Sequence, residues 1–202
     1  MILKYLKEAT GARHIALESR LPLLDAGMSR LDYLQLLRRF SGYYEPLEAQ
    51  LLALPYWRSM DFDYVERYKT PRLKQDLQAL GETPRTLEQV DRCSHLPALA
   101  SLEQLLGCLY VIEGATLGGQ VITRRLQANL GLAPASGAAF FSGYGAQTGS
   151  RWKAFCAMLN ANAGEAKSQA DIVGSANLTF ETLGKWLFPD IPQIALPASR
   201  TS

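Results

Sequence analysis

The chain has 202 residues, of which 48% are hydrophobic and 20% charged, and its formal net charge at pH 7 is +2. This length and balance predict one globular domain with a sizeable core, and the small net charge argues against a nucleic-acid partner. No basic segment with an apolar run and a cleavage site opens the chain, so we expect a cytoplasmic protein without export. The three cysteines lack a metal-binding spacing and are expected to be reduced thiols.

A first helix is predicted from Ile2 to about Leu21, because apolar positions recur there every three or four residues. His14 falls on the apolar face, with Lys7 two turns before it and Glu18 one turn after it. A histidine on such a face is often a satisfied core residue. However, an imidazole that binds a metal usually donates its other ring N–H to a carboxylate or carbonyl. Glu18 offers that carboxylate, so both interpretations of His14 stay open at this point.

A second helix is predicted after the loop at residues 25–27, with Ser29 as its cap and Asp32 three residues later. Pro46 interrupts its apolar repeat. Because proline removes a donor and clashes with the preceding turn, we expect a kink or a break near residues 42–45. A group of aromatic residues on and after this helix is expected to pack in the core. These residues are Tyr43, Tyr44, Tyr56 and Trp57.

The next forty residues mainly connect longer elements. A short helix is predicted from Asp61 to Tyr68. Thr70 and Pro71 then predict a helix that ends at Gly81, with threonine as the cap and proline at the first helical position. Residues 82–100 are rich in loop-forming residues and contain His95, which we expect at the surface.

The most informative stretch runs from Ser101 to Gly131 and predicts one long helix. Ser101 and Gln104 form a capping-box signature at its start, and Gly131 follows the last apolar residue, as at a helix C-terminus. At about 1.5 Å per residue, such a helix would be roughly 45 Å long. Glycines in its middle each cost about 1 kcal/mol relative to alanine, so they need an explanation. They are Gly114, Gly118 and Gly119.

Glycines at this spacing remove the side chains from one face of the helix. A wide, flat ligand could then lie against the backbone, and the helix could bend there. The same spacing would also let another helix cross closely. A transmembrane dimer motif is disfavoured because Glu113 and Gln120 would lie inside the bilayer, and we expect no membrane partner. A phosphate-binding loop is disfavoured because no predicted strand precedes the glycines.

The remaining chain predicts two more helices, from Thr148 to about Ala161 and from Ser168 to Leu187. Residues 133–149, before them, are rich in glycine, alanine and serine. We expect residues 1–188 to form the domain and residues 189–202 to form a loose tail. Because no segment alternates apolar and polar residues long enough for a strand, the predicted fold is all-α.

Two stretches of the sequence together resemble the haem oxygenases. The first is Lys7-Glu8-Ala9-Thr10 with His14 and Glu18 following it, and the second is Gly114–Ile122. The segment 140–152 resembles the bacterial branch that often accompanies phytochrome photoreceptors. The resemblance covers most of the chain, and its motifs are modest individually but quite specific together.

The resemblance implies a single-domain helical bundle with a b-type haem between the first helix and a kinked, glycine-rich helix. It implies that His14 ligates the iron, with Glu18 tuning its basicity, and that Lys7 pairs with a haem propionate. It also implies that Gly114, Gly118 and Gly119 form the catalytic wall, where backbone groups and water steer bound oxygen. Tyr144 and Arg151 are weaker propionate candidates, and a core tyrosine and a surface arginine are equally good interpretations of them.

The activity implied by the resemblance is an oxygen- and electron-dependent opening of haem to biliverdin, carbon monoxide and ferrous iron. Haem is then both cofactor and substrate. The implied electron donor is a ferredoxin or a flavin reductase, and the bacterial branch suggests a bacteriophytochrome as recipient of the product.

One position departs from the family pattern. Animal members carry an aspartate, which orders the water that protonates bound oxygen, where this chain has Ala115. Thr116, Glu113, or backbone groups with water are the alternatives here. The departure motivates a rival hypothesis, a non-catalytic haem carrier of the same fold. A helical di-metal oxidase would need Glu-x-x-His pairs, and the sequence contains none.

Overall fold

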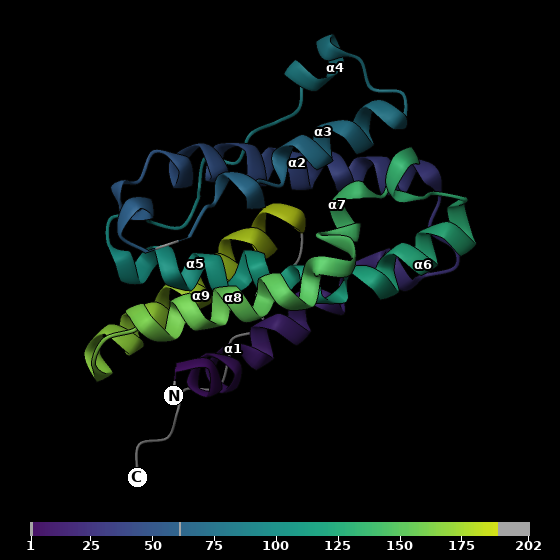
Figure 1. The fold of residues 1–202 in the computed structure, drawn as a ribbon. Coiled ribbons are helices and arrows are strands. Elements are labelled where there is room, and N and C mark those ends of the chain that lie inside the picture. The colour runs from purple at the N-terminus through teal and green to yellow at the C-terminus, as the bar shows by residue number, and fades with distance from the viewer. Residues whose placement is uncertain (1, 61, 190–202) are drawn as a thin grey trace.

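The computed structural model describes residues 2–60 and 62–189, and every regular element in these ranges is a helix (Figure 1). The α-helices are α1 (Ile2–Glu18), α2 (Arg30–Leu52), α3 (Thr70–Ala79), α4 (Pro84–Glu88), α5 (Leu102–Gly114), α6 (Gly119–Leu130), α7 (Ala139–Ser142), α8 (Thr148–Asn162) and α9 (Ala166–Leu187). Six 3-10 turns join them: η1 (Pro22–Leu24), η2 (Pro55–Ser59), η3 (Val65–Arg67), η4 (Ala115–Gly118), η5 (Pro134–Ser136) and η6 (Gly145–Gln147). The predicted all-α fold is therefore confirmed. The predicted tail falls almost entirely outside the described residues.

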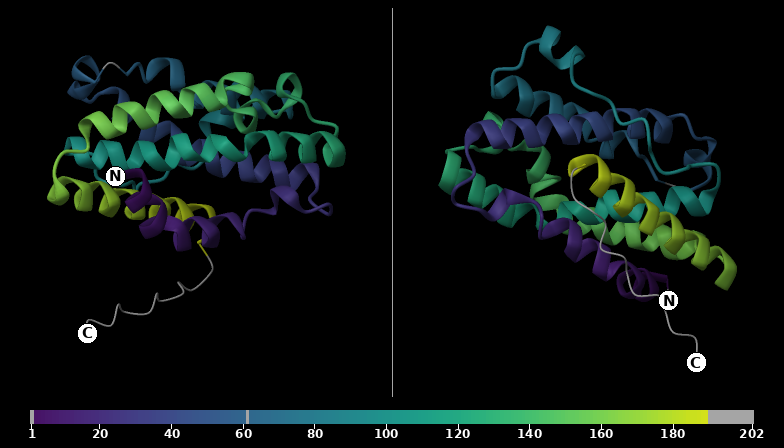
Figure 2. Two further views of the ribbon diagram at one scale, coloured as in Figure 1. Left: turned by 60° about the horizontal axis from the view of Figure 1, so that its bottom comes forward. Right: turned by 180° about the vertical axis from the view of Figure 1, so that it is seen from behind.

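The path α5–η4–α6 runs through the middle of the molecule, with α2 and α3 on one side of it and α1 and α9 on the other (Figure 1), and the left view of Figure 2 shows α8 across the path from α1 and α9. Helix α9 packs most extensively against α5, and it also packs against α1. Gly107 permits this approach, because a Cβ atom at that position would lie 2.3 Å from the carbonyl oxygen of Ile172. The glycine thus lets the backbones of α5 and α9 touch.

The predicted kink or break at Pro46 is not a break, because helix α2 is continuous through this proline. Proline leaves the carbonyl of Gly42 without its helical N–H donor. The N–H of Cys93 donates to that carbonyl instead, at 2.9 Å. A Cβ atom on Gly42 would lie 2.2 Å from the carbonyl oxygen of Asp91, so the glycine lets this distant loop approach the helix. The expected aromatic packing is present, with Tyr43 and Tyr44 buried and Tyr56 and Trp57 partly buried against the core.

The segment before α3 differs from the prediction. Among the described residues from 62 to 68, only η3 (Val65–Arg67) is helical, and Asp61 lies outside the described residues. Helix α3 begins one residue earlier than predicted, with Lys69 rather than Thr70 at the cap. The cap comes from α2: the buried carboxylate of Glu48 accepts the backbone N–H groups of Lys69 and Thr70 and the hydroxyls of Thr70 and Tyr64. A carboxylate from another helix therefore replaces the local threonine cap.

The predicted long helix is present, but its middle turn is a 3-10 turn, η4, between α5 and α6. Ser101 caps its start and Gly131, with a φ of +69°, ends it as predicted. In a capping box, the side chain of Gln104 would accept the backbone N–H of Ser101. Instead, its oxygen accepts the N–H of the preceding residue, Ala100. The stretch 102–130 is long and apolar enough to cross a membrane, but half of its most apolar window is buried, as in the core helix of a globular fold.

Candidate functional site

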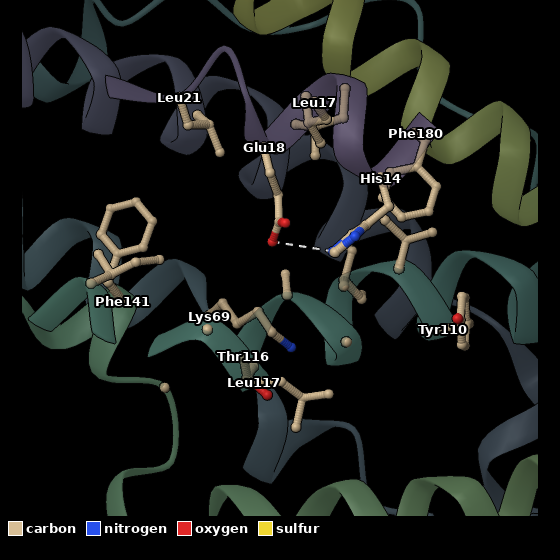
Figure 3. A pocket seen from close by; sticks show the side chains of 18 of the residues that line it. His14, Leu17, Glu18, Leu21, Lys69, Tyr110, Thr116, Leu117, Phe141 and Phe180 are labelled. Atoms are coloured by element: carbon tan, nitrogen blue, oxygen red, sulfur yellow. Dashed lines mark ion pairs between the residues drawn. The ribbon is translucent and has the colours of Figure 1, made fainter. Parts of the chain in front are cut away.

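A cavity of about 600 Å³ lies between α1 and the path α5–η4–α6, and most of its surface is apolar. Residues of helix α7 and of the chain before α8 line it, as do Tyr110 and Trp152. Figure 3 shows α1 above the cavity, with His14, Leu17, Glu18 and Leu21 pointing toward the glycine-rich turn below. The volume lies within the range of about 300–1,000 Å³ that is typical of small-molecule and cofactor sites.

His14 lines this cavity and is not a satisfied core residue, since 48% of its side chain is exposed. Its Nε2 atom lies 3.2 Å from Oε1 of Glu18, one turn later on α1 (Figure 3). The edge of its ring packs on Phe180 of α9, with 5.8 Å between the ring centroids. The structure therefore brings together the imidazole and the carboxylate that the sequence paired, and both face the cavity.

The glycines of the central path divide into two groups. Gly114 and Gly118 line the cavity, and a Cβ atom on Gly118 would meet only Cδ1 of Ile122, at 3.7 Å. Gly119 is buried, and a Cβ atom there would lie 2.1 Å from the carbonyl oxygen of Phe141 in α7. The close helix crossing is therefore observed at Gly119, and the space that a flat ligand would need is present at Gly118. Gly118 leaves the cavity wall bare, and Gly119 lets α7 cross α6 closely.

A buried ion cluster lies directly behind the wall at the end of α5. The carboxylate of Glu113 accepts hydrogen bonds from Nη1 of Arg67 at 2.6 Å, Nζ of Lys69 at 2.7 Å and the hydroxyl of Tyr144 at 2.8 Å. Burial by itself would raise the pKa of Glu113, but the ammonium of Lys69, the Tyr144 hydroxyl and the Arg67 guanidinium together lower it. Glu113 is therefore an ionised anchor for the turn rather than a source of protons.

Sequence reasoning missed Arg67 and Lys69, and no local signal could have found them. Their partner, Glu113, is more than forty residues away, and neither cation belongs to a recognisable motif. Lys69 nevertheless lines the cavity on the glycine side, opposite His14 (Figure 3). Thr116 also lines this side, and its hydroxyl donates to the backbone carbonyl of Glu113 at 2.7 Å.

Two of the three predicted propionate candidates line the cavity, and the third does not. Lys7 lines the cavity, and it forms no ion pair with a carboxylate of residues 2–60 or 62–189. The ring of Tyr144 lines the cavity as well, although its hydroxyl is bound to Glu113. Arg151 is not among the lining residues, and its guanidinium pairs at 3.3 Å with the carboxylate of Glu66 in η3. Arg72, which the sequence did not single out, lines the cavity instead.

A second buried carboxylate holds the part of the cavity wall that α7 forms. Asp76 of α3 accepts the backbone N–H groups of Ala139 and Phe140 at 2.7 and 2.8 Å. These bonds hold the start of α7, which places Phe140 and Phe141 in the cavity wall. Burial raises the pKa of Asp76 to about 6, and the two N–H donors oppose that rise.

These residues fit haem. A flat macrocycle needs an apolar slot, an axial ligand on one face and space on the other. His14 offers an imidazole, Gly118 offers bare backbone opposite it, and Lys7 offers a cation for a propionate.

Sequence comparison assigns the family. The model of the family described as Heme oxygenase matches residues 1–188 of the chain. The chain belongs to the heme oxygenase family. A curated heme oxygenase from Xanthomonas campestris pv. campestris (strain 8004) is 31% identical over 162 residues, which cover 76% of this chain and 89% of the relative. The family supports haem degradation as the activity and makes the chain an oxidoreductase that acts on haem.

Solved heme oxygenase structures share the fold. The enzyme of Neisseria meningitidis, solved with NO and CO bound, superposes with a TM-score of 0.77 at 23% identity, covering 93% of this chain and 90% of that one. The Leptospira interrogans heme oxygenase gives a TM-score of 0.74 at 18% identity, covering 92% and 98%. Heme oxygenase-1 from Synechocystis sp. PCC6803, solved in complex with heme, gives 0.70 at 19% identity, covering 92% and 90%.

Proposed function

We propose that this heme oxygenase cleaves b-type haem to biliverdin, carbon monoxide and ferrous iron, using molecular oxygen and electrons from a partner. The observation that carries the proposal is the placement of His14 opposite the bare turn at Gly118 across an apolar cavity. Haem, when bound, supplies the iron that activates oxygen and the ring carbon that is oxidised.

In this proposal, the imidazole of His14 would hold the iron of haem. Glu18 lies 3.2 Å from Nε2 of that imidazole. A carboxylate this close to the ring could accept the N–H of the ring nitrogen that does not hold the iron. Lys7, one of the cations at the rim of the cavity, pairs with a propionate and orients the macrocycle.

On the opposite face, the backbone at Gly114 and Gly118 leaves room for oxygen and water against the ring. Gly119 acts indirectly, because it holds this turn against α7. Glu113 is ionised and fully engaged, so it does not deliver protons. Thr116 is the remaining hydroxyl in the turn, and we assign to it the ordering of the water that the aspartate orders in animal members. Its neighbour, Ala115, carries no polar side chain.

The partners follow from the same proposal. Electrons come from a ferredoxin or a flavin reductase, the reaction takes place in the cytoplasm, and a bacteriophytochrome receives the biliverdin. The supporting feature for the last point is the resemblance of residues 140–152 to the phytochrome-associated branch. Tyr144 and Arg151 are assigned no direct propionate contact, since each already has a protein partner.

A haemin titration of the wild type, His14→Ala and His95→Ala tests the ligand. His95 is the matched control, because it is the chain's other histidine and is exposed outside the cavity. We expect a histidine-ligated absorption spectrum for the wild type and His95→Ala and its loss in His14→Ala. An unchanged spectrum in His14→Ala would contradict the assignment of the axial ligand.

Ala115 supports one alternative function, a non-catalytic haem carrier. Reduced, haem-loaded protein supplied with oxygen separates the two hypotheses. The enzyme releases carbon monoxide and a green linear tetrapyrrole, and a carrier releases neither while still binding haemin through His14.

A further inference from the structure

The ring of Tyr144 is surrounded by positive charge. The cations lie between 5.0 and 5.8 Å from its centroid: Arg67 at 5.8 Å, Lys69 at 5.7 Å, Arg72 at 5.3 Å and Arg151 at 5.0 Å. Each distance is within the range of about 6 Å over which a cation is attracted to an aromatic face. We call these four cations and Tyr144 the cationic cluster.

The carboxylates near the cationic cluster do not balance its charge. Arg67 and Lys69 share the single carboxylate of Glu113, which leaves this buried group with one excess positive charge. Arg151 pairs with Glu66, an exposed residue. Arg72 enters no ion pair among residues 2–60 and 62–189, and its guanidinium donates a hydrogen bond to the backbone carbonyl of Tyr68. The cluster therefore carries a net positive charge.

The excess charge faces the cavity on the glycine side. Lys69, Arg72 and Tyr144 all line the cavity. Gly143, next to Tyr144, packs on the turn η4, since a Cβ atom there would lie 3.3 Å from Cβ of Thr116. Figure 3 shows Lys69 beside Thr116, across the cavity from Glu18 on α1. The cavity is thus polarised, with a carboxylate on the His14 side and cations on the opposite side.

We propose that Arg72, with Lys69 and Tyr144, forms an anion subsite that favours small monoanions over neutral ligands on the glycine side of the cavity. This inference rests on the proposed function, in which His14 occupies the other face of haem. In a mostly apolar cavity, unit charges interact far more strongly than in water, so one unpaired guanidinium suffices for measurable selectivity. The class of ligand is a compact anion such as azide or fluoride.

Arg72 is the residue to change, because Glu113 keeps both of its buried cations when Arg72 is replaced. Azide and fluoride are titrated into the ferric, haem-loaded protein, and imidazole serves as the neutral ligand. For Arg72→Leu, we expect dissociation constants for both anions to rise about threefold to tenfold, with that for imidazole unchanged. Arg72→Lys restores most of the anion affinity, because it keeps the charge.

Arg85→Leu is the matched control. It removes the same charge from α4, an exposed helix whose residues do not line the cavity, and it should leave all three affinities unchanged. Equal anion affinities in the wild type and Arg72→Leu would overturn the subsite, as would a parallel loss of imidazole affinity. A wild type that does not bind haemin through His14 would instead contradict the proposed function itself.

Discussion

At the scale of single residues, the site depends on charges that are buried but compensated. Glu113 carries its negative charge at the last turn of α5, where burial alone would raise its pKa. Three donors keep it ionised, and in turn its carboxylate is the counter-charge for two buried cations. Removing one partner of such a group leaves the others without compensation, which costs more than the intact group contributes.

Glu113→Gln tests this dependence. The amide keeps the shape but leaves Arg67 and Lys69 buried without a counter-charge, so we expect the free energy of unfolding to fall by about 3–5 kcal/mol. Urea denaturation at pH 7 measures it. Glu66→Gln is the control, since the Glu66 side chain is 66% exposed and the loss of its pair with Arg151 should cost less than about 1 kcal/mol. Equal losses in the two variants would contradict the role given to burial.

At the scale of elements, the central path α5–η4–α6 both lines the cavity and packs against α7, and two adjacent glycines serve these two roles. Gly118 belongs to the 3-10 turn and faces the cavity, whereas Gly119 opens α6 and touches the backbone of α7. A methyl group has room at Gly118 and none at Gly119. The first position therefore concerns the ligand, and the second concerns the fold.

The variants Gly118→Ala and Gly119→Ala should consequently affect different properties, haemin binding in the first and stability in the second. Gly119→Ala forces α6 and α7 apart, and we expect it to lower the free energy of unfolding by about 1–3 kcal/mol. Gly118→Ala should leave thermal unfolding of the haem-free protein unchanged but weaken haemin binding, because its methyl group enters the slot. Calorimetry and haemin titration of the same samples measure the two effects. If Gly118→Ala lost stability but still bound haem normally, the assignment of Gly118 to the ligand rather than to the fold would be wrong.

Sequence patterns predicted these elements well where the signal is local. The apolar repeat placed His14 on one helix, and Ser101 and Gly131 marked the ends of the central path. Local patterns failed where the partner is distant. Pro46 indicated a kink or a break, but α2 continues through it, and the N–H of Cys93 donates to the carbonyl of Gly42 that the proline leaves free. For the same reason, the role of Arg72 could not be predicted, since its position in the cavity depends on the packing of α3 beside the loop before α8.

At the scale of the whole molecule, buried carboxylates tie distant segments around the cavity. Asp76 joins α3 to α7 across 63 residues of sequence, and its side chain has no exposed surface. Its two hydrogen bonds hold Phe140 and Phe141 in the wall. The integrity of the cavity thus depends on an ionisable group whose pKa, about 6, lies close to neutral pH.

This pKa predicts how stability depends on pH. The folded-state pKa of Asp76 is about 6 against an ordinary value of 3.8, so the folded protein binds the proton more tightly. The resulting stabilisation is complete below the ordinary pKa and is lost as the pH rises through about 6. Between pH 4 and pH 7, Asp76 alone should lower the free energy of unfolding by up to about 3 kcal/mol.

Urea denaturation of the wild type and Asp76→Asn at several pH values isolates this contribution. Residue 76 of the variant does not titrate, so the hydrogen bond it loses lowers the free energy of unfolding by a similar amount at every pH. The difference in this free energy between the wild type and the variant should shrink as the pH rises. Asp32→Asn gives a control of opposite sign, because the Ser29 hydroxyl and backbone N–H lower the pKa of that exposed carboxyl. Its stabilisation is present above the ordinary pKa and is lost as the pH falls. Parallel curves for the wild type and Asp76→Asn from pH 4 to pH 7 would show that Asp76 titrates alike in the folded and unfolded chains, and that α7 is held independently of its charge.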